Sequence, residues 1–112
     1  MCRRPHGASY VTWAGVPPKQ LRITGGEGQL QIYRSSEDGR RQFCKICGSQ
    51  MFCWHERGRE RAPAMIDVAL ASLHGEIDRK PEAHFFYDSR AGWTVVDDDL
   101  PKRGGETGGQ PL

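Results

Sequence analysis

Two cysteines with two residues between them, Cys44 and Cys47, are the sharpest chemical signal in the sequence. Two thiolates at this spacing on a tight turn can both reach one Zn²⁺ at about 2.3 Å. Gly48 follows directly and permits the positive φ that such a turn often needs. The pair supplies only half of a tetrahedral site, so the sequence predicts a zinc knuckle whose other ligands come from elsewhere.

The rest of the ligand set has no matching motif, because no second C-x-x-C or C-x-C is present. The candidates are the other cysteines and the histidines, each of which also has an ordinary structural interpretation: Cys2, Cys53, His6, His55, His74 and His84. A redox dithiol and plain structural cysteines stay open as alternatives for the Cys44–Cys47 pair. A thioredoxin-like pair would precede a long helix, which residues 49–54 do not resemble, so zinc is favoured.

Short segments of β-forming residues between turns must position the knuckle. Gly 14 and Pro 7 supply many turns, and Asp38-Gly39 is the strongest hairpin pair. A charge-dense loop is expected at residues 56–61 and an irregular or short helical segment at 92–100. Alternation and β-branched or aromatic content predict strands at residues 9–15, 21–23, 30–33, 42–44, 51–55, 64–70 and 82–87. The expected fold class is therefore mainly β, a small domain of short antiparallel strands.

Composition narrows the function classes. The chain has 112 residues, with 16 Lys and Arg against 14 Asp and Glu, a net charge of +2 that does not favour nucleic acid as a partner. No apolar run is long enough to span a membrane and no signal peptide opens the chain, so we expect a cytoplasmic protein without a membrane partner. The length fits one domain, expected over residues 1–103, followed by a flexible glycine-rich tail over 104–112.

Several ordered segments resemble the glutathione-dependent formaldehyde-activating enzyme family, which includes centromere-protein-V-like proteins. The resemblance covers roughly residues 2–101. Its segments are Cys2–Ala8, Val11–Trp13, Thr24–Gly26, Tyr33–Ser36, Arg41–Ser49, Asp67–Leu73 and His84–Trp93. It implies a β-tent-like fold with a structural and a catalytic zinc site, and a carbon–sulfur lyase activity that joins formaldehyde and glutathione as the S-hydroxymethyl adduct.

Carried over residue by residue, the resemblance makes Cys44 and Cys47 the knuckle half of the structural zinc site. Cys2 corresponds to the last cysteine of the catalytic C-x-C-x-x-C segment, the one followed by two arginines. Because guanidinium groups match carboxylates, Arg3, Arg4 and Arg41 are expected to bind glutathione, although surface charge would also explain them.

The chain departs from the family pattern at its beginning. It lacks the N-terminal strand with its C-x-C and the first two catalytic cysteines, so both zinc sites are incomplete here. Either the true start lies upstream, or a short form has lost the chemistry and forms a homodimer that covers the exposed sheet edge. The rival function is then a catalytically degenerate, zinc-ribbon-like module that binds protein or nucleic acid.

Overall fold

The computed structural model describes residues 2–56 and 65–112, so the expected charged loop at 56–61 lies, apart from Glu56, outside the described residues. The chain forms two compact units: Thr12–His74, and Met1–Val11 together with Gly75–Leu112. Each unit is described by itself below. Neither unit ends at residue 103, so the expected domain boundary stays a prediction.

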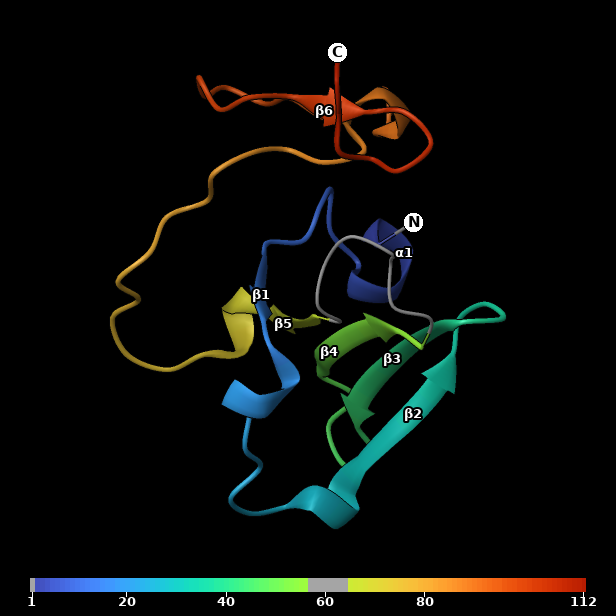
Figure 1. The fold of residues 1–112 in the computed structure, drawn as a ribbon, viewed down its shortest axis with the longest axis vertical. Helices are drawn as coiled ribbons and strands as arrows, with labels where there is room; N and C mark the ends of the chain where they lie inside the picture. Colours follow the sequence, from blue (N-terminus) through green and yellow to red (C-terminus); the bar gives the residue numbers. More distant parts are fainter. Residues whose placement is uncertain (1, 57–64) are drawn as a thin grey trace. The chain divides into compact units, whose positions relative to one another are not determined.

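An antiparallel sheet forms the unit Thr12–His74 (Figure 1). The five strands in the described part of the unit stand in the order β1-β5-β4-β3-β2. Each pair of neighbours is antiparallel, which confirms the prediction of a mainly β chain. The strands are β1 (Trp13–Val16), β2 (Leu30–Arg34), β3 (Gly39–Cys44), β4 (Gln50–His55) and β5 (Ile66–Ala69), and the 3-10 turns are η1 (Pro18–Gln20), η2 (Glu27–Gln29) and η3 (Leu70–Ser72).

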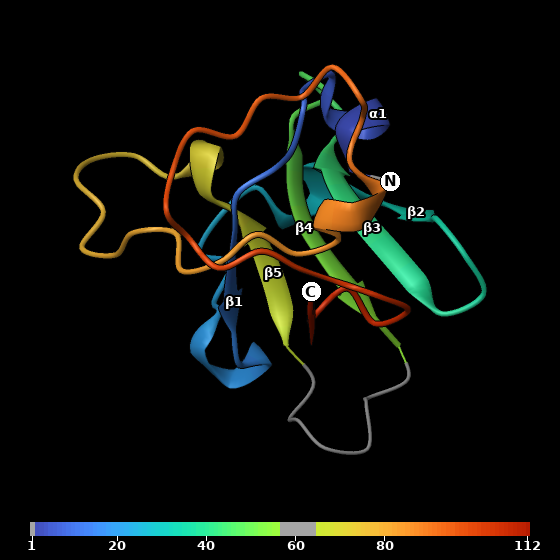
Figure 2. The same ribbon diagram turned by 90° about the horizontal axis from the view of Figure 1, so that it is seen from above.

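The hairpin between β2 and β3 forms where Asp38-Gly39 predicts a turn (Figure 2). Ser35 N–H donates to the carbonyl of Gly39 at 3.1 Å, and Gly39 N–H donates to Ser36 Oγ at 2.9 Å. A Cβ on Gly39 would lie 2.6 Å from Ser36 Oγ. A side chain at position 39 would therefore displace the serine hydroxyls that close the turn against its backbone.

One predicted strand is wrong in this unit. Residues 21–23 alternate in polarity, yet they form no strand in the structure. Pro17 and Pro18 begin the turn η1, and the chain then reaches Gly26, which has φ of +74°. An extended segment without a partner strand gains no ladder hydrogen bonds, so alternation by itself does not make it a strand.

The other unit is held by short contacts between distant segments. It contains the four-residue helix α1 (Arg3–His6), the 3-10 turn η4 (Tyr87–Ser89) and the two-residue strands β6 (Arg103–Gly104) and β7 (Gln110–Pro111). The strand predicted at 82–87 is wrong, because only the bridge His84–Lys102 forms there. Phe86 has a φ of 53°, which ends the extended conformation.

The C-terminal segment carries structure where the sequence predicts a flexible tail. Gly104 pairs with Gln110 in the antiparallel β6–β7 pair, and Phe86 N–H donates to the carbonyl of Gly108 at 3.0 Å. A Cβ on Gly108 would collide with the Phe86 ring. The glycines permit this close approach, and the flexibility expected of residues 104–112 stays a prediction. No helix in the described part of the chain has the length and apolar character that crossing a bilayer requires.

The sheet buries few large side chains. Phe52 on β4 and Val68 on β5 are 6% and 7% exposed, and they are partners in the β4–β5 ladder. Ala69, which follows Val68, is 4% exposed. With so few buried side chains, each one carries a large share of the apolar burial that stabilises the sheet.

Phe52→Ala is expected to lower the free energy of unfolding by about 3 kcal/mol, because it leaves a cavity beside Val68. Chemical denaturation followed by circular dichroism measures this. Tyr33→Ala is the matched control, since that side chain is 62% exposed and its loss should cost less than about 1 kcal/mol. Equal losses in both variants would contradict the assignment of Phe52 to the core.

Candidate functional site

The turn that connects β3 to β4 holds the two knuckle cysteines. Cys44 is the last residue of β3, and its N–H donates to the carbonyl of Ser49 at 2.9 Å. Gly48 N–H donates to the carbonyl of Cys44 at 2.7 Å, and Gly48 has a φ of +80°. The turn is thus closed from both sides, and Gly48 adopts the positive φ that the sequence predicts for it.

The side chain of Ser49 contacts the thiol of Cys47. Cys47 Sγ lies 3.2 Å from Ser49 Oγ, so the thiol can donate to the hydroxyl and the hydroxyl can donate to the thiolate, and Cys47 is exposed. Hydrogen bonds from the Ser49 hydroxyl, the Ser49 backbone and the Cys44 thiol, in that order, lower the pKa of Cys47 below its usual value. A thiol with a lowered pKa is more often the thiolate, the form that binds metals and attacks electrophiles.

The turn fits zinc as two ligands of four. Both cysteines lie on one turn, and the Cys44 thiol is one of the causes that lower the pKa of Cys47, which is compatible with the two sulfurs binding one ion. Residues 2–56 and 65–112 contain no group of three or more Cys, His, Asp and Glu side chains that could hold a metal. Cys53 lies on β4, opposite Arg41 and Asp67 in the ladders. A closed tetrahedral site therefore needs two ligands beyond this turn.

The remaining predicted site residues are divided between the two units. Cys2, half-buried, directly precedes α1, and Arg3 and Arg4 form the first positions of that helix. Arg41 lies on β3, three residues before Cys44. The structure brings Cys2, Arg3 and Arg4 together in one unit, and Arg41, Cys44 and Cys47 in the other.

His84 and Asp98 form a hydrogen-bonded pair that the sequence analysis does not predict. His84 Nε2 lies 2.8 Å and 3.0 Å from the two carboxylate oxygens of Asp98. The ring of Tyr10 meets the His84 ring edge-on at 5.8 Å, and the His84 side chain is 14% exposed. A carboxylate that holds one imidazole nitrogen orients the ring for proton transfer at the other. Nothing local signals a pair 14 residues apart.

Asp98 also has a local role in its turn. Its Oδ1 accepts the Leu100 N–H at 3.0 Å. The hydrogen bond from His84 is the main cause that lowers the pKa of Asp98, with Leu100 N–H and the charges of His84 and Lys102 adding to it. The acidic run 97–99, expected to be a solvated turn, thus contains one carboxylate with specific partners.

A comparison with known protein families finds a match to this chain. The sequence model described as glutathione-dependent formaldehyde-activating enzyme matches residues 1–89. The matched range includes Cys2, the Cys44–Cys47 turn and His84, and it ends before Asp98. No solved structure matches the chain.

Ser49→Ala is expected to raise the pKa of Cys47 in the reduced, metal-free protein, because the main hydrogen bond to its sulfur is lost. The rate of Cys47 alkylation by iodoacetamide, followed against pH by mass spectrometry, should shift its midpoint upward. Ser89→Ala is the control, since that hydroxyl donates to the carbonyl of Phe86. An unchanged midpoint in Ser49→Ala would contradict the role of Ser49.

His84→Phe is expected to raise the pKa of Asp98 toward its ordinary value, because the ring stays while the hydrogen bond is lost. A carboxyl whose pKa is depressed by folding contributes stability above its ordinary pKa, and the contribution disappears as pH falls through the folded value. Between about pH 4 and pH 2, the free energy of unfolding should therefore fall more steeply with decreasing pH in the wild type than in His84→Phe.

Carboxyl ¹³C NMR titration of Asp98 and acid unfolding followed by circular dichroism measure the two effects. Asp99→Asn serves as the control, with the Asp98 titration expected to match wild type. Identical Asp98 titrations in wild type and His84→Phe would show that the pair does not hold in solution.

Proposed function

The chain belongs to the glutathione-dependent formaldehyde-activating enzyme family, and we propose that it is a zinc-dependent carbon–sulfur lyase acting on the adduct of a thiol and a small aldehyde. Membership supports a glutathione-dependent, formaldehyde-activating-like function in general, and it is the observation that carries the proposal. The finer proposal is that glutathione and formaldehyde are the two substrates and S-hydroxymethylglutathione the product.

The proposed reaction needs no oxidant or reductant. The thiol sulfur attacks the carbonyl carbon, a carbon–sulfur bond forms, and the proton lost by the thiol ends on the former carbonyl oxygen. The reverse reaction breaks the same bond. The protein has to bind the peptide, favour the thiolate and move one proton. We assign Arg3 and Arg4, which lie in one unit, to one carboxylate of glutathione, because guanidinium forks form paired hydrogen bonds with carboxylates.

Zinc is the proposed cofactor. Cys44 and Cys47 are assigned as two ligands of a structural ion, in agreement with the closed turn and the lowered pKa of Cys47. Cys2 is assigned as a ligand of the catalytic ion. When bound, zinc supplies Lewis acidity, which stabilises a thiolate or polarises a carbonyl oxygen. The described residues do not supply the four protein ligands of a structural zinc site or the three protein ligands of a catalytic zinc site.

The test is the exchange rate between free formaldehyde and S-hydroxymethylglutathione, measured by NMR exchange spectroscopy with zinc-loaded protein. The full chain should exceed the spontaneous rate. Cys2→Ser should lower this excess at least about tenfold. Loss of a residue that only hydrogen-bonds to a metal ligand often lowers activity by that factor, and Cys2 is proposed to be a ligand itself. Cys53→Ser is the matched cysteine control and should keep the excess, with circular dichroism used to verify its fold.

The metal content separates the proposal from its rivals. Cys44→Ser and Cys47→Ser should lower bound zinc in elemental analysis, whereas Cys53→Ser should not. Zinc at the turn without rate excess would favour the zinc-ribbon-like binding module. A reversible Cys44–Cys47 disulfide in a chain that takes up no zinc would favour a redox dithiol, and either result would contradict the lyase proposal.

A further inference from the structure

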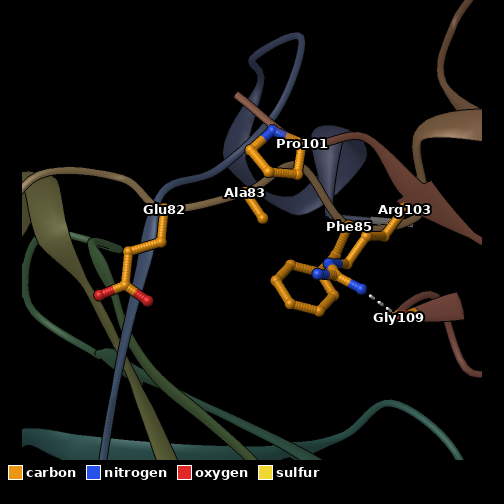
Figure 3. A pocket seen from close by; sticks show the side chains of 6 residues that line it. All are labelled: Glu82, Ala83, Phe85, Pro101, Arg103 and Gly109. Atoms are coloured by element: carbon orange, nitrogen blue, oxygen red, sulfur yellow. Dashed lines mark hydrogen bonds between the residues drawn. The ribbon is translucent and has the colours of Figure 1, made fainter. Parts of the chain in front are cut away.

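A pocket of about 420 Å³ lies in the unit that contains residues 75–112 (Figure 3). Its volume is within the range of sites that hold small organic molecules. Segments from three parts of the chain form it, on both sides of the His84–Lys102 bridge. The lining residues are Glu82, Ala83, Phe85, Pro101, Arg103 and Gly109.

A positive and a negative side chain border the pocket without neutralising each other. Glu82 lies on one side of Ala83, and Arg103 lies on the other side, next to the Phe85 ring (Figure 3). The only hydrogen bond of the Arg103 side chain within the described residues is a long one, from Nη1 to the carbonyl of Gly109 at 3.5 Å. No described residue forms an ion pair with Glu82 or Arg103. Both groups keep most of their binding capacity for a ligand.

The surface between the two charges is apolar. Phe85 is 60% exposed, an unusual state for a large aromatic side chain. Gly109 supports the ring, because a Cβ there would lie 3.2 Å from Phe85 Cε1. Ala83 and Pro101 complete the apolar lining. The pocket therefore offers a cation beside an aromatic ring, an apolar stretch, and then an anion.

We propose that this pocket binds a small zwitterionic peptide, with a ligand carboxylate on Arg103, a ligand ammonium on Glu82 and the apolar part of the ligand across Phe85. The choice of peptide rests on the proposed function, since glutathione carries an ammonium group and two carboxylates on one short chain. A simple anion fits less well, because Glu82 would repel it. The pocket is thus assigned as the site that holds the peptide part of the thiol substrate.

The probe for the test is S-methylglutathione, which keeps every charge of glutathione but has no thiol to react with formaldehyde. It is titrated into the ¹⁵N-labelled full chain, and amide shifts give the Kd. Arg103→Gln should raise the Kd about tenfold, as expected for a lost hydrogen bond to a charged group. Glu82→Gln should raise it about threefold, as for an exposed ion pair. Arg90→Gln is the matched control, because its guanidinium lies 3.9 Å from the Tyr87 ring centre, outside the pocket lining, and it should bind like wild type.

A second ligand tests the orientation. N-acetyl-S-methylglutathione lacks the ammonium charge, so Glu82→Gln should change its Kd little, while Arg103→Gln should still weaken it about tenfold. Arg103→Lys keeps the positive charge but lacks the paired donors of the guanidinium group. Its Kd should lie between the values for wild type and Arg103→Gln. Amide spectra of each variant without ligand establish that it is folded.

Three results would overturn the proposal: no binding of S-methylglutathione, shifts that avoid the pocket residues, or a Kd that neither Arg103→Gln nor Glu82→Gln changes. The failure of the lyase proposal looks different, because it is measured as the absence of formaldehyde exchange. If S-methylglutathione binds in the pocket but formaldehyde exchange is not accelerated, the pocket proposal stands and the lyase proposal is rejected. If exchange is accelerated but binding does not depend on Arg103 or Glu82, the lyase proposal stands and the pocket proposal is rejected.

Discussion

The antiparallel pairing of β3 with β4 is the interaction on which the sheet and the cysteine turn both depend. The turn begins at Cys44 and ends before Gln50, so the register of the two strands decides how the thiols are presented. The register shifts between Gln42 and Phe43, directly before the turn. At the other end of the pair, Glu56 N–H donates to the carbonyl of Asp38 at 2.7 Å. Both ends are therefore held by backbone hydrogen bonds, which leaves the side chains of the turn available for chemistry.

The features that could be predicted from sequence are those with local causes. Asp38-Gly39 and the C-x-x-C-G segment are each specified within a few residues, and the structure has turns at both. Strands with a neighbour to pair with, such as residues 51–55, also follow from alternation. The strands predicted at 21–23 and 82–87 fail for the complementary reason. Their pattern is correct, but the described structure gives the first no partner and the second only one bridge.

The second unit was harder to predict because its contacts join residues far apart in sequence. Asp88 Oδ2 accepts the Gly105 N–H at 2.9 Å, and a Cβ on Gly104 would collide with the Asp88 carboxylate. Neither contact has a signature at either position alone. The same holds for His84 with Asp98 and for the pocket charges Glu82 and Arg103. A glycine-rich sequence leaves space beside the backbone. The sequence alone does not tell whether solvent or a packed neighbouring residue fills that space.

The cysteine turn illustrates why a half-site has two chemical outcomes. The hydrogen bonds that favour the Cys47 thiolate serve metal binding and nucleophilic attack equally well. Two thiolates alone bind zinc far more weakly than four, because each missing ligand leaves a position to water. If further ligands reach the turn, Cys47 is withdrawn from solvent and becomes structural. If they do not, an exposed thiol with a lowered pKa remains in the same turn as Cys44. The supply of two more ligands, and not the geometry of the turn, therefore decides which chemistry the cysteines perform.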